Sequence, residues 1–183
     1  MKMIKYLPFA ALLLSAQGFA GQYEYDKNTY DISLNKAKTS VTVKHCNAKK
    51  KCKESQANIP ELIELLELRI KDYDTWLKDE PALLKEVKSQ VANKDTQRIK
   101  DGKTEYTMLK IGEGFSLPVP SSDLKKGNYD LITGALAANK ERYSGALTLL
   151  KSAKLPAPFK TDDYAKANRI TELVNIIQFA KML

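Results

Sequence analysis

The strongest constraint on the fold is the apolar periodicity between Ile59 and Leu77. Apolar residues recur there at alternating steps of four and three, the spacing of one face of an α-helix. Six residues form this stripe: Ile59, Ile63, Leu66, Ile70, Tyr73 and Leu77. Asn58 and Glu61 form a capping-box-like pair, and Pro60 lies in the first turn, where its missing N–H costs nothing. The sequence therefore predicts a helix over these residues, whose buried stripe contributes roughly 9–18 kcal/mol gross.

The first twenty residues have the features of a Sec-type secretory signal peptide. Two lysines precede an apolar core at residues 7–14, and residues 18–20 offer small side chains at the two positions that a signal peptidase reads. The apolar core is too short to remain as a membrane anchor, and no later run is long enough for a transmembrane segment. We expect cleavage after Ala20, a periplasmic or secreted protein, and a single α+β domain over residues 21–183.

The two cysteines predict a disulfide. Cys46 and Cys52 are the only cysteines, separated by five residues, and the predicted export takes them to an oxidising compartment. Closing this short loop would contribute about 2–3 kcal/mol. A metal site is disfavoured, because the only histidine, His45, is adjacent to Cys46 and is poorly placed to bind the same ion. The phosphate-loop spacings are also absent. We therefore expect neither a metal nor a cofactor.

Basic residues are concentrated around this cysteine pair. Between Lys36 and Lys53 there are seven lysines and no acidic residue. The candidate binding residues here are Lys44, His45, Lys49, Lys50, Lys51 and Lys53. Two interpretations stay open: a solvated basic loop, or an anion-binding patch that the disulfide holds rigid against a negatively charged membrane, a glycan or an acidic protein. Nucleic acid is not expected, because the cluster has no arginine or interleaved aromatic residue and the chain is predicted to be exported.

The remaining patterns predict an α+β fold with about four helices and a small antiparallel sheet. The expected helices are 59–77, 81–92, 130–151 and 162–182, and the expected strands are about 30–34, 40–44 and 104–111, with a short partner at 97–100. Tyr23, Tyr25 and Tyr30 fit either sheet packing or an aromatic ligand platform. Pro118 and Pro120 are expected to stiffen an irregular connection, which could line a groove.

The sequence gives little support to an enzyme. His45 stands alone and no GxSxG motif is present, so a Ser-His-Asp triad is not expected. The remaining catalytic option is a pair of carboxylates of the kind that cleaves glycans. Its candidates are Asp72, Asp74, Asp79, Glu80 and Glu113. Glu113 is kept as a candidate site residue, because it lies between two glycines in the kind of flexible loop that active sites favour.

We expect an exported, non-catalytic protein-binding domain of the cell envelope. An inhibitor or immunity protein that blocks a toxic or lytic enzyme is one such class, and it predicts a protruding element, either the lysine loop or residues 112–120. Two alternatives stay open. A peptidoglycan-acting carboxylate hydrolase predicts carboxylates converging in a deep pocket. An envelope structural or assembly factor predicts an exposed apolar face on the C-terminal helix.

Overall fold

The structure is a computed structural model that describes residues 17–179. These divide into two compact units, residues 17–66 with 145–179 and residues 67–144. Two helices, α1 (Ile59–Lys78) and α4 (Asp130–Ser152), have residues in both units. Most of the predicted signal peptide lies outside the described residues. The expectation of one domain over residues 21–183 stays a prediction.

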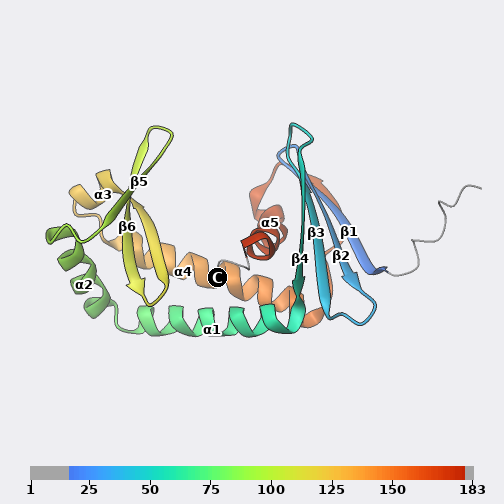
Figure 1. The fold of residues 1–183 in the computed structure, drawn as a ribbon, viewed down its shortest axis with the longest axis horizontal. Coiled ribbons are helices and arrows are strands. Elements are labelled where there is room, and N and C mark those ends of the chain that lie inside the picture. Colours follow the sequence, from blue (N-terminus) through green and yellow to red (C-terminus); the bar gives the residue numbers. More distant parts are fainter. Residues whose placement is uncertain (1–16, 180–183) are drawn as a thin grey trace, which may run out of the picture. The chain divides into compact units, whose positions relative to one another are not determined.

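The first unit is built on a five-stranded mixed sheet with strand order β4-β3-β2-β1-β8 (Figure 1). Its strands are β1 (Gln17–Tyr25), β2 (Asn28–Asn35), β3 (Ser40–Cys46), β4 (Cys52–Asn58) and β8 (Phe159–Thr161). Consecutive strands from β1 to β4 pair antiparallel, and β8 joins β1 in parallel. The predicted strands at 30–34 and 40–44 are β2 and β3. The prediction of one small sheet was wrong, because polar strands such as β4 carry no apolar alternation that reveals them.

Helix α5 (Tyr164–Phe179) packs against this sheet. Alternate strand residues are buried on one face of the sheet: Tyr23, Tyr30, Ile32, Leu34, Val41 and Val43. The helix buries Ile170, Leu173, Val174, Ile176 and Ile177. It begins two residues later than predicted, because the Asp163 carboxylate accepts a hydrogen bond from the Ala165 N–H at 2.9 Å. The described part of α5 is thus a core helix, and it does not present the exposed apolar face that an assembly factor requires.

Tyr23 and Tyr30 are core residues of the sheet. Tyr23 is fully buried, its ring lies 5.0 Å from that of Phe159, and its hydroxyl donates to the Pro156 carbonyl at 2.9 Å. Tyr30 is also buried and stacks on His45. These contacts favour the packing interpretation over an open aromatic platform.

The second unit packs a three-stranded antiparallel sheet against helices. The strand order is β5-β6-β7. The strands are β5 (Gln97–Asp101), β6 (Thr104–Gly112) and β7 (Phe115–Pro120), and the unit adds α2 (Glu80–Ala92) and the short α3 (Ser121–Lys125). Its core consists of Tyr73, Leu83, Val87, Leu109, Ile111, Leu117, Val119, Leu124, Ile132 and Leu136. The segment after residue 112, predicted to be irregular, is therefore a strand followed by a helix.

Pro118 and Pro120 fit into β7 because of their register. They lie directly opposite Met108 and Tyr106 of β6. Lys110, two residues after Met108 on β6, directs its backbone N–H and C=O toward Gln90 of α2. Strand alternation places the N–H and C=O of Met108 and Tyr106 on the same side, away from β7. The two prolines therefore occupy positions at the edge of the sheet where the facing residues of β6 form no hydrogen bond to β7, so the missing proline N–H groups cost no ladder bond.

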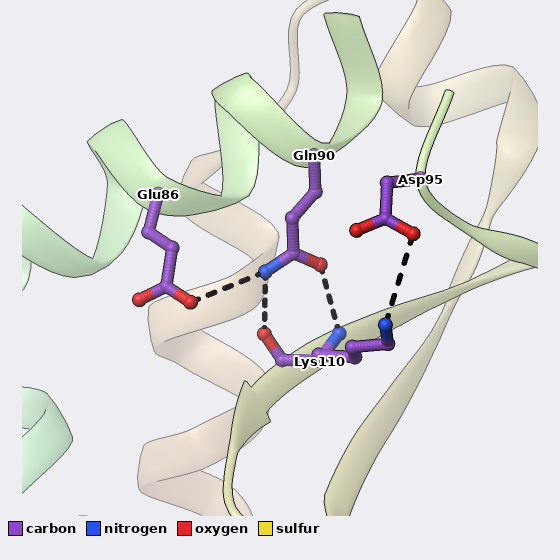
Figure 2. A network of polar contacts seen from close by, with 4 residues as sticks. All are labelled: Glu86, Gln90, Asp95 and Lys110. Atoms are coloured by element: carbon purple, nitrogen blue, oxygen red, sulfur yellow. Dashed lines mark hydrogen bonds and ion pairs between the residues drawn. The ribbon is translucent and has the colours of Figure 1, made fainter. Parts of the chain in front are cut away.

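Gln90 completes the hydrogen bonding of β6 beyond the end of β5 (Figure 2). Its Nε2 donates to the Lys110 carbonyl at 2.7 Å, and its Oε1 accepts from the Lys110 N–H at 3.0 Å. Nε2 also lies 3.4 Å from the Glu86 carboxylate, and the Lys110 ammonium lies 3.7 Å from Asp95. The side-chain amide thus takes the place of a neighbouring strand and covers this stretch of edge.

An aromatic cluster fixes the β6–β7 turn to α1. The Phe115 ring stacks on Trp76, and the Arg69 guanidinium lies 5.3 Å from the centroid of the same ring. Arg69 and Trp76 are seven residues apart, about two helical turns, which leaves room for Phe115 between them. Tyr73 lies between these residues on α1 and contacts both rings edge-on. Gly112 completes the packing, because an added Cβ would lie 2.6 Å from the Trp76 ring.

Candidate binding site

The predicted lysine loop is the turn of the β3–β4 hairpin in the first unit (Figure 1). Cys46 ends β3 and Cys52 begins β4, and the two residues are direct cross-strand partners. Their sulfur atoms form the predicted disulfide, with the Cα atoms 4.0 Å apart. The disulfide therefore closes the loop at its base, where the strand ladder ends.

Asn47 organises the five residues inside the disulfide. Its side-chain oxygen accepts hydrogen bonds from the backbone N–H groups of Lys49 and Lys51, both at 3.0 Å. Its own N–H donates to the Lys51 carbonyl at 3.0 Å, and its carbonyl accepts from Lys50 at 2.8 Å. Sequence reasoning missed this role, although an asparagine at the start of a short loop is a common turn signal. The loop is thus fixed by four hydrogen bonds as well as by the disulfide.

The tip of the hairpin displays three consecutive lysines. Lys49, Lys50 and Lys51 are all exposed, and Lys50 has a positive φ of 58°. No acidic residue lies between the two cysteines. Three like charges on a fixed turn create a local positive potential that attracts anionic groups.

Lys44 and Lys53 lie on opposite faces of the sheet. Lys44 stands directly opposite Asp31 of β2 and Glu54 of β4. Lys53 stands opposite His45, on the other face. The structure therefore places the two lysines on different faces, and Lys44 lies between two carboxylate-bearing residues that offset its charge.

His45 is packed within the sheet. Its ring stacks on Tyr30 with centroids 4.8 Å apart and an interplanar angle of 18°. Its Nε2 lies 3.3 Å from the Asn28 side-chain oxygen. Burial lowers the pKa of His45 below its usual value, so the ring is neutral at neutral pH. The residue supports the hairpin base and adds no positive charge to the lysine tip.

The polar face of the same sheet contains an open hollow of about 530 Å³. It is lined by Ala20, Gly21, Gln22, Asp31, Ile32, Ser33, Thr42, Lys44 and Glu54. Asp31 and Glu54 stand two strands apart, about 10 Å between Cα atoms at ordinary strand spacing, and Lys44 lies on the strand between them. This is not the deep pocket with two converging carboxylates that a glycan hydrolase would need.

The carboxylates singled out from the sequence do not gather in one place. Asp72 lies 3.5 Å from Arg69, Asp74 forms an ion pair with Lys140, and Asp79 caps α2 by accepting the Ala82 N–H at 3.2 Å. Glu80 lies in the first turn of α2. Glu113 is exposed in the two-residue turn between β6 and β7, in the second unit, whereas the lysine loop belongs to the first. Three of the five thus have structural partners.

The described residues contain neither a metal-binding group nor a membrane-spanning helix. Among residues 17–179, no three histidine, cysteine, aspartate or glutamate side chains gather as a metal-binding group. In the same range, no helix is both long enough and apolar enough to cross a membrane. Comparison with known proteins found no matching family model, no similar curated protein and no similar solved structure.

Proposed function

We propose that the protein is an exported, non-catalytic protein-binding domain of the cell envelope, and that the β3–β4 turn is its binding element. The observation that carries the proposal is the set of three exposed lysines, Lys49, Lys50 and Lys51, on a turn fixed by a disulfide. A fixed turn loses little conformational entropy on binding, so more of its electrostatic attraction appears as affinity.

The charge of the turn defines the partner. Three lysines without a neighbouring acid favour an acidic cleft or groove on another protein. A toxic or lytic enzyme with an acidic substrate cleft has this chemistry, and a turn inserted into that cleft would block the substrate. The protein then acts as an inhibitor or immunity protein, which agrees with the open hollow and the scattered carboxylates described above.

The test is capture of a partner from envelope extracts by the purified protein with its disulfide intact. The bait is compared with a variant carrying Lys49→Ala, Lys50→Ala and Lys51→Ala. A matched control carries Lys71→Ala, Lys125→Ala and Lys126→Ala, which removes the same charge from exposed positions in the second unit. We expect the wild type and the control to capture the same acidic protein, and the turn variant to lose it.

The captured partner is then bound to purified bait at increasing salt. Affinity is expected to fall with ionic strength, because exposed charges are screened over about 8 Å at physiological salt. Capture of no protein, or equal capture by the turn variant, contradicts the proposal. If the bait binds anionic lipid vesicles and captures no protein, the partner is an envelope surface and not a protein.

A further inference from the structure

Strand β5 is the least covered part of the second sheet. All of its residues, Gln97–Asp101, are exposed, and within the described residues it pairs only with β6. At the other edge, Pro118 and Pro120 of β7 offer no N–H groups, and Gln90 covers β6 beyond the end of β5 (Figure 2). Strand β5 thus presents an edge of this sheet on which no proline removes an outward N–H.

The register shows which backbone groups face the open edge. The alternation established for β6 directs the N–H and C=O of Tyr106 toward β5, where its partner is Ile99. Ile99 therefore bonds to β6. Arg98 and Lys100, on either side of Ile99, direct their N–H and C=O outward. An added strand would bond to these two residues.

The two faces of the edge differ in chemistry. Arg98 and Lys100 project their side chains from one face, and both are exposed cations. Glu105 of β6 stands directly opposite Lys100 on the same face. Ile99 projects from the other face and is 41% exposed. It begins a row across the three strands that continues with Tyr106 and Pro120. Two cations and one carboxylate leave this face of the edge with a net positive charge, and the other face is apolar.

A second copy of β5 is a poor partner for this edge. An antiparallel pairing centred on Ile99 would place Arg98 opposite Lys100 of the other copy, and symmetry would repeat the contact. Like charges directly opposite one another destabilise a strand pair. A strand with carboxylates at the two positions would instead form opposite-charge pairs.

We propose that β5 binds an extended segment of a partner protein, in which acidic and apolar residues alternate, as a fourth antiparallel strand. Two acidic residues lie opposite Arg98 and Lys100, and the apolar residue between them lies opposite Ile99. Backbone hydrogen bonds supply the affinity, and the alternation of charge and apolar side chains supplies the specificity. This site shares no residue with the β3–β4 turn and does not depend on the function proposed for that turn.

The test uses a synthetic eight-residue peptide that alternates glutamate and valine, labelled with a fluorophore, and the purified protein with its disulfide intact. We expect saturable binding by fluorescence anisotropy. Hydrogen exchange of residues 97–101 is expected to slow when the peptide is bound. The geometry also predicts which peptide N–H groups matter. N-methylation of the glutamates should abolish binding, because their N–H groups face β5, whereas N-methylation of the valines should preserve it.

Charge complementarity is tested by a swap. The double variant Arg98→Glu with Lys100→Glu should bind the peptide at least about tenfold more weakly and should gain affinity for a lysine–valine peptide. The matched control is Lys94→Glu with Lys103→Glu, which changes the net charge by the same amount outside the strand. This control should retain most of the binding of the glutamate–valine peptide.

The backbone contribution is tested at one position. Lys100→Pro removes an outward N–H without removing a bond to β6, and Lys100→Ala removes only the charge. The proline variant should fold and should bind more weakly than the alanine variant. Absence of saturable binding overturns the proposal, as does equal loss in the charge swap and its control, or insensitivity to N-methylation of the glutamates. Self-association through β5 in place of peptide binding also overturns it.

Discussion

The Trp76 ring stacks on Phe115 with centroids 5.2 Å apart and an interplanar angle of 22°. The contact joins α1 to the first residue of β7 and needs the space next to Gly112, which has no side chain. The β6–β7 turn is therefore held to α1 by aromatic packing, with Tyr73 beneath it in the core.

Gly112→Ala is expected to lower the free energy of unfolding by about 1–3 kcal/mol, because the new Cβ meets the Trp76 ring at 2.6 Å. The measurement is urea unfolding followed by the fluorescence of Trp76, the only tryptophan. The control is Gly134→Ala, a helical site with no atom near the added Cβ, which should stabilise by about 0.5–1 kcal/mol. Equal effects of the two substitutions would show that space beside Trp76 is not limiting.

Loss of the disulfide is expected to destabilise the protein by about 2 kcal/mol, because the loop that it closes in the unfolded chain is short. The measurement compares wild type with the double variant Cys46→Ser and Cys52→Ser in urea, with and without a reductant. Reduced wild type should match the variant, and the variant should not respond to reductant. A reductant response in the double variant would refute this assignment, since the chain has no other cysteine.

Gln90→Ala is expected to destabilise the protein by about 1–2 kcal/mol, because it removes both hydrogen bonds to the Lys110 backbone. Hydrogen exchange at the Lys110 amide should rise in the same variant. Glu86→Ala is the control, since it removes only a longer contact at 3.4 Å and leaves the two backbone bonds in place. Comparable losses in both variants would argue against the strand-like role of Gln90.

His45 is expected to make stability depend on pH below its ordinary pKa of about 6.5. Because burial lowers the pKa in the folded protein, the unfolded chain takes up the proton first as the pH falls. The stability that the neutral His45 ring contributes at neutral pH is therefore lost as the pH falls from 6.5 toward the lower pKa of the folded state. Unfolding at about pH 7.5 and about pH 5 should differ more for wild type than for His45→Gln. Identical differences would contradict the prediction.

Local patterns in the sequence determined the long helices and the loop closure, but not the short α3. The predicted helix at 59–77 is α1, which begins at Ile59 with the Asn58 side chain accepting the Glu61 N–H at 3.2 Å. Helices predicted at 81–92 and 130–151 are α2 and α4 within one residue. These features depend on caps and on side chains three or four residues apart, which the sequence contains directly.

The pairing of the strands and the geometry of the candidate sites were decided only by tertiary structure. Strand β4 is polar, and pairing with β3 makes it a strand; β7 contains two prolines, and register against β6 makes them acceptable. Register also places Lys44 between Asp31 and Glu54. It directs the backbone N–H and C=O groups of Arg98 and Lys100 toward an open edge. Strand pairing joins residues far apart in the chain, and a shift of one residue reverses every side chain, so a single sequence without a partner strand leaves these positions undetermined.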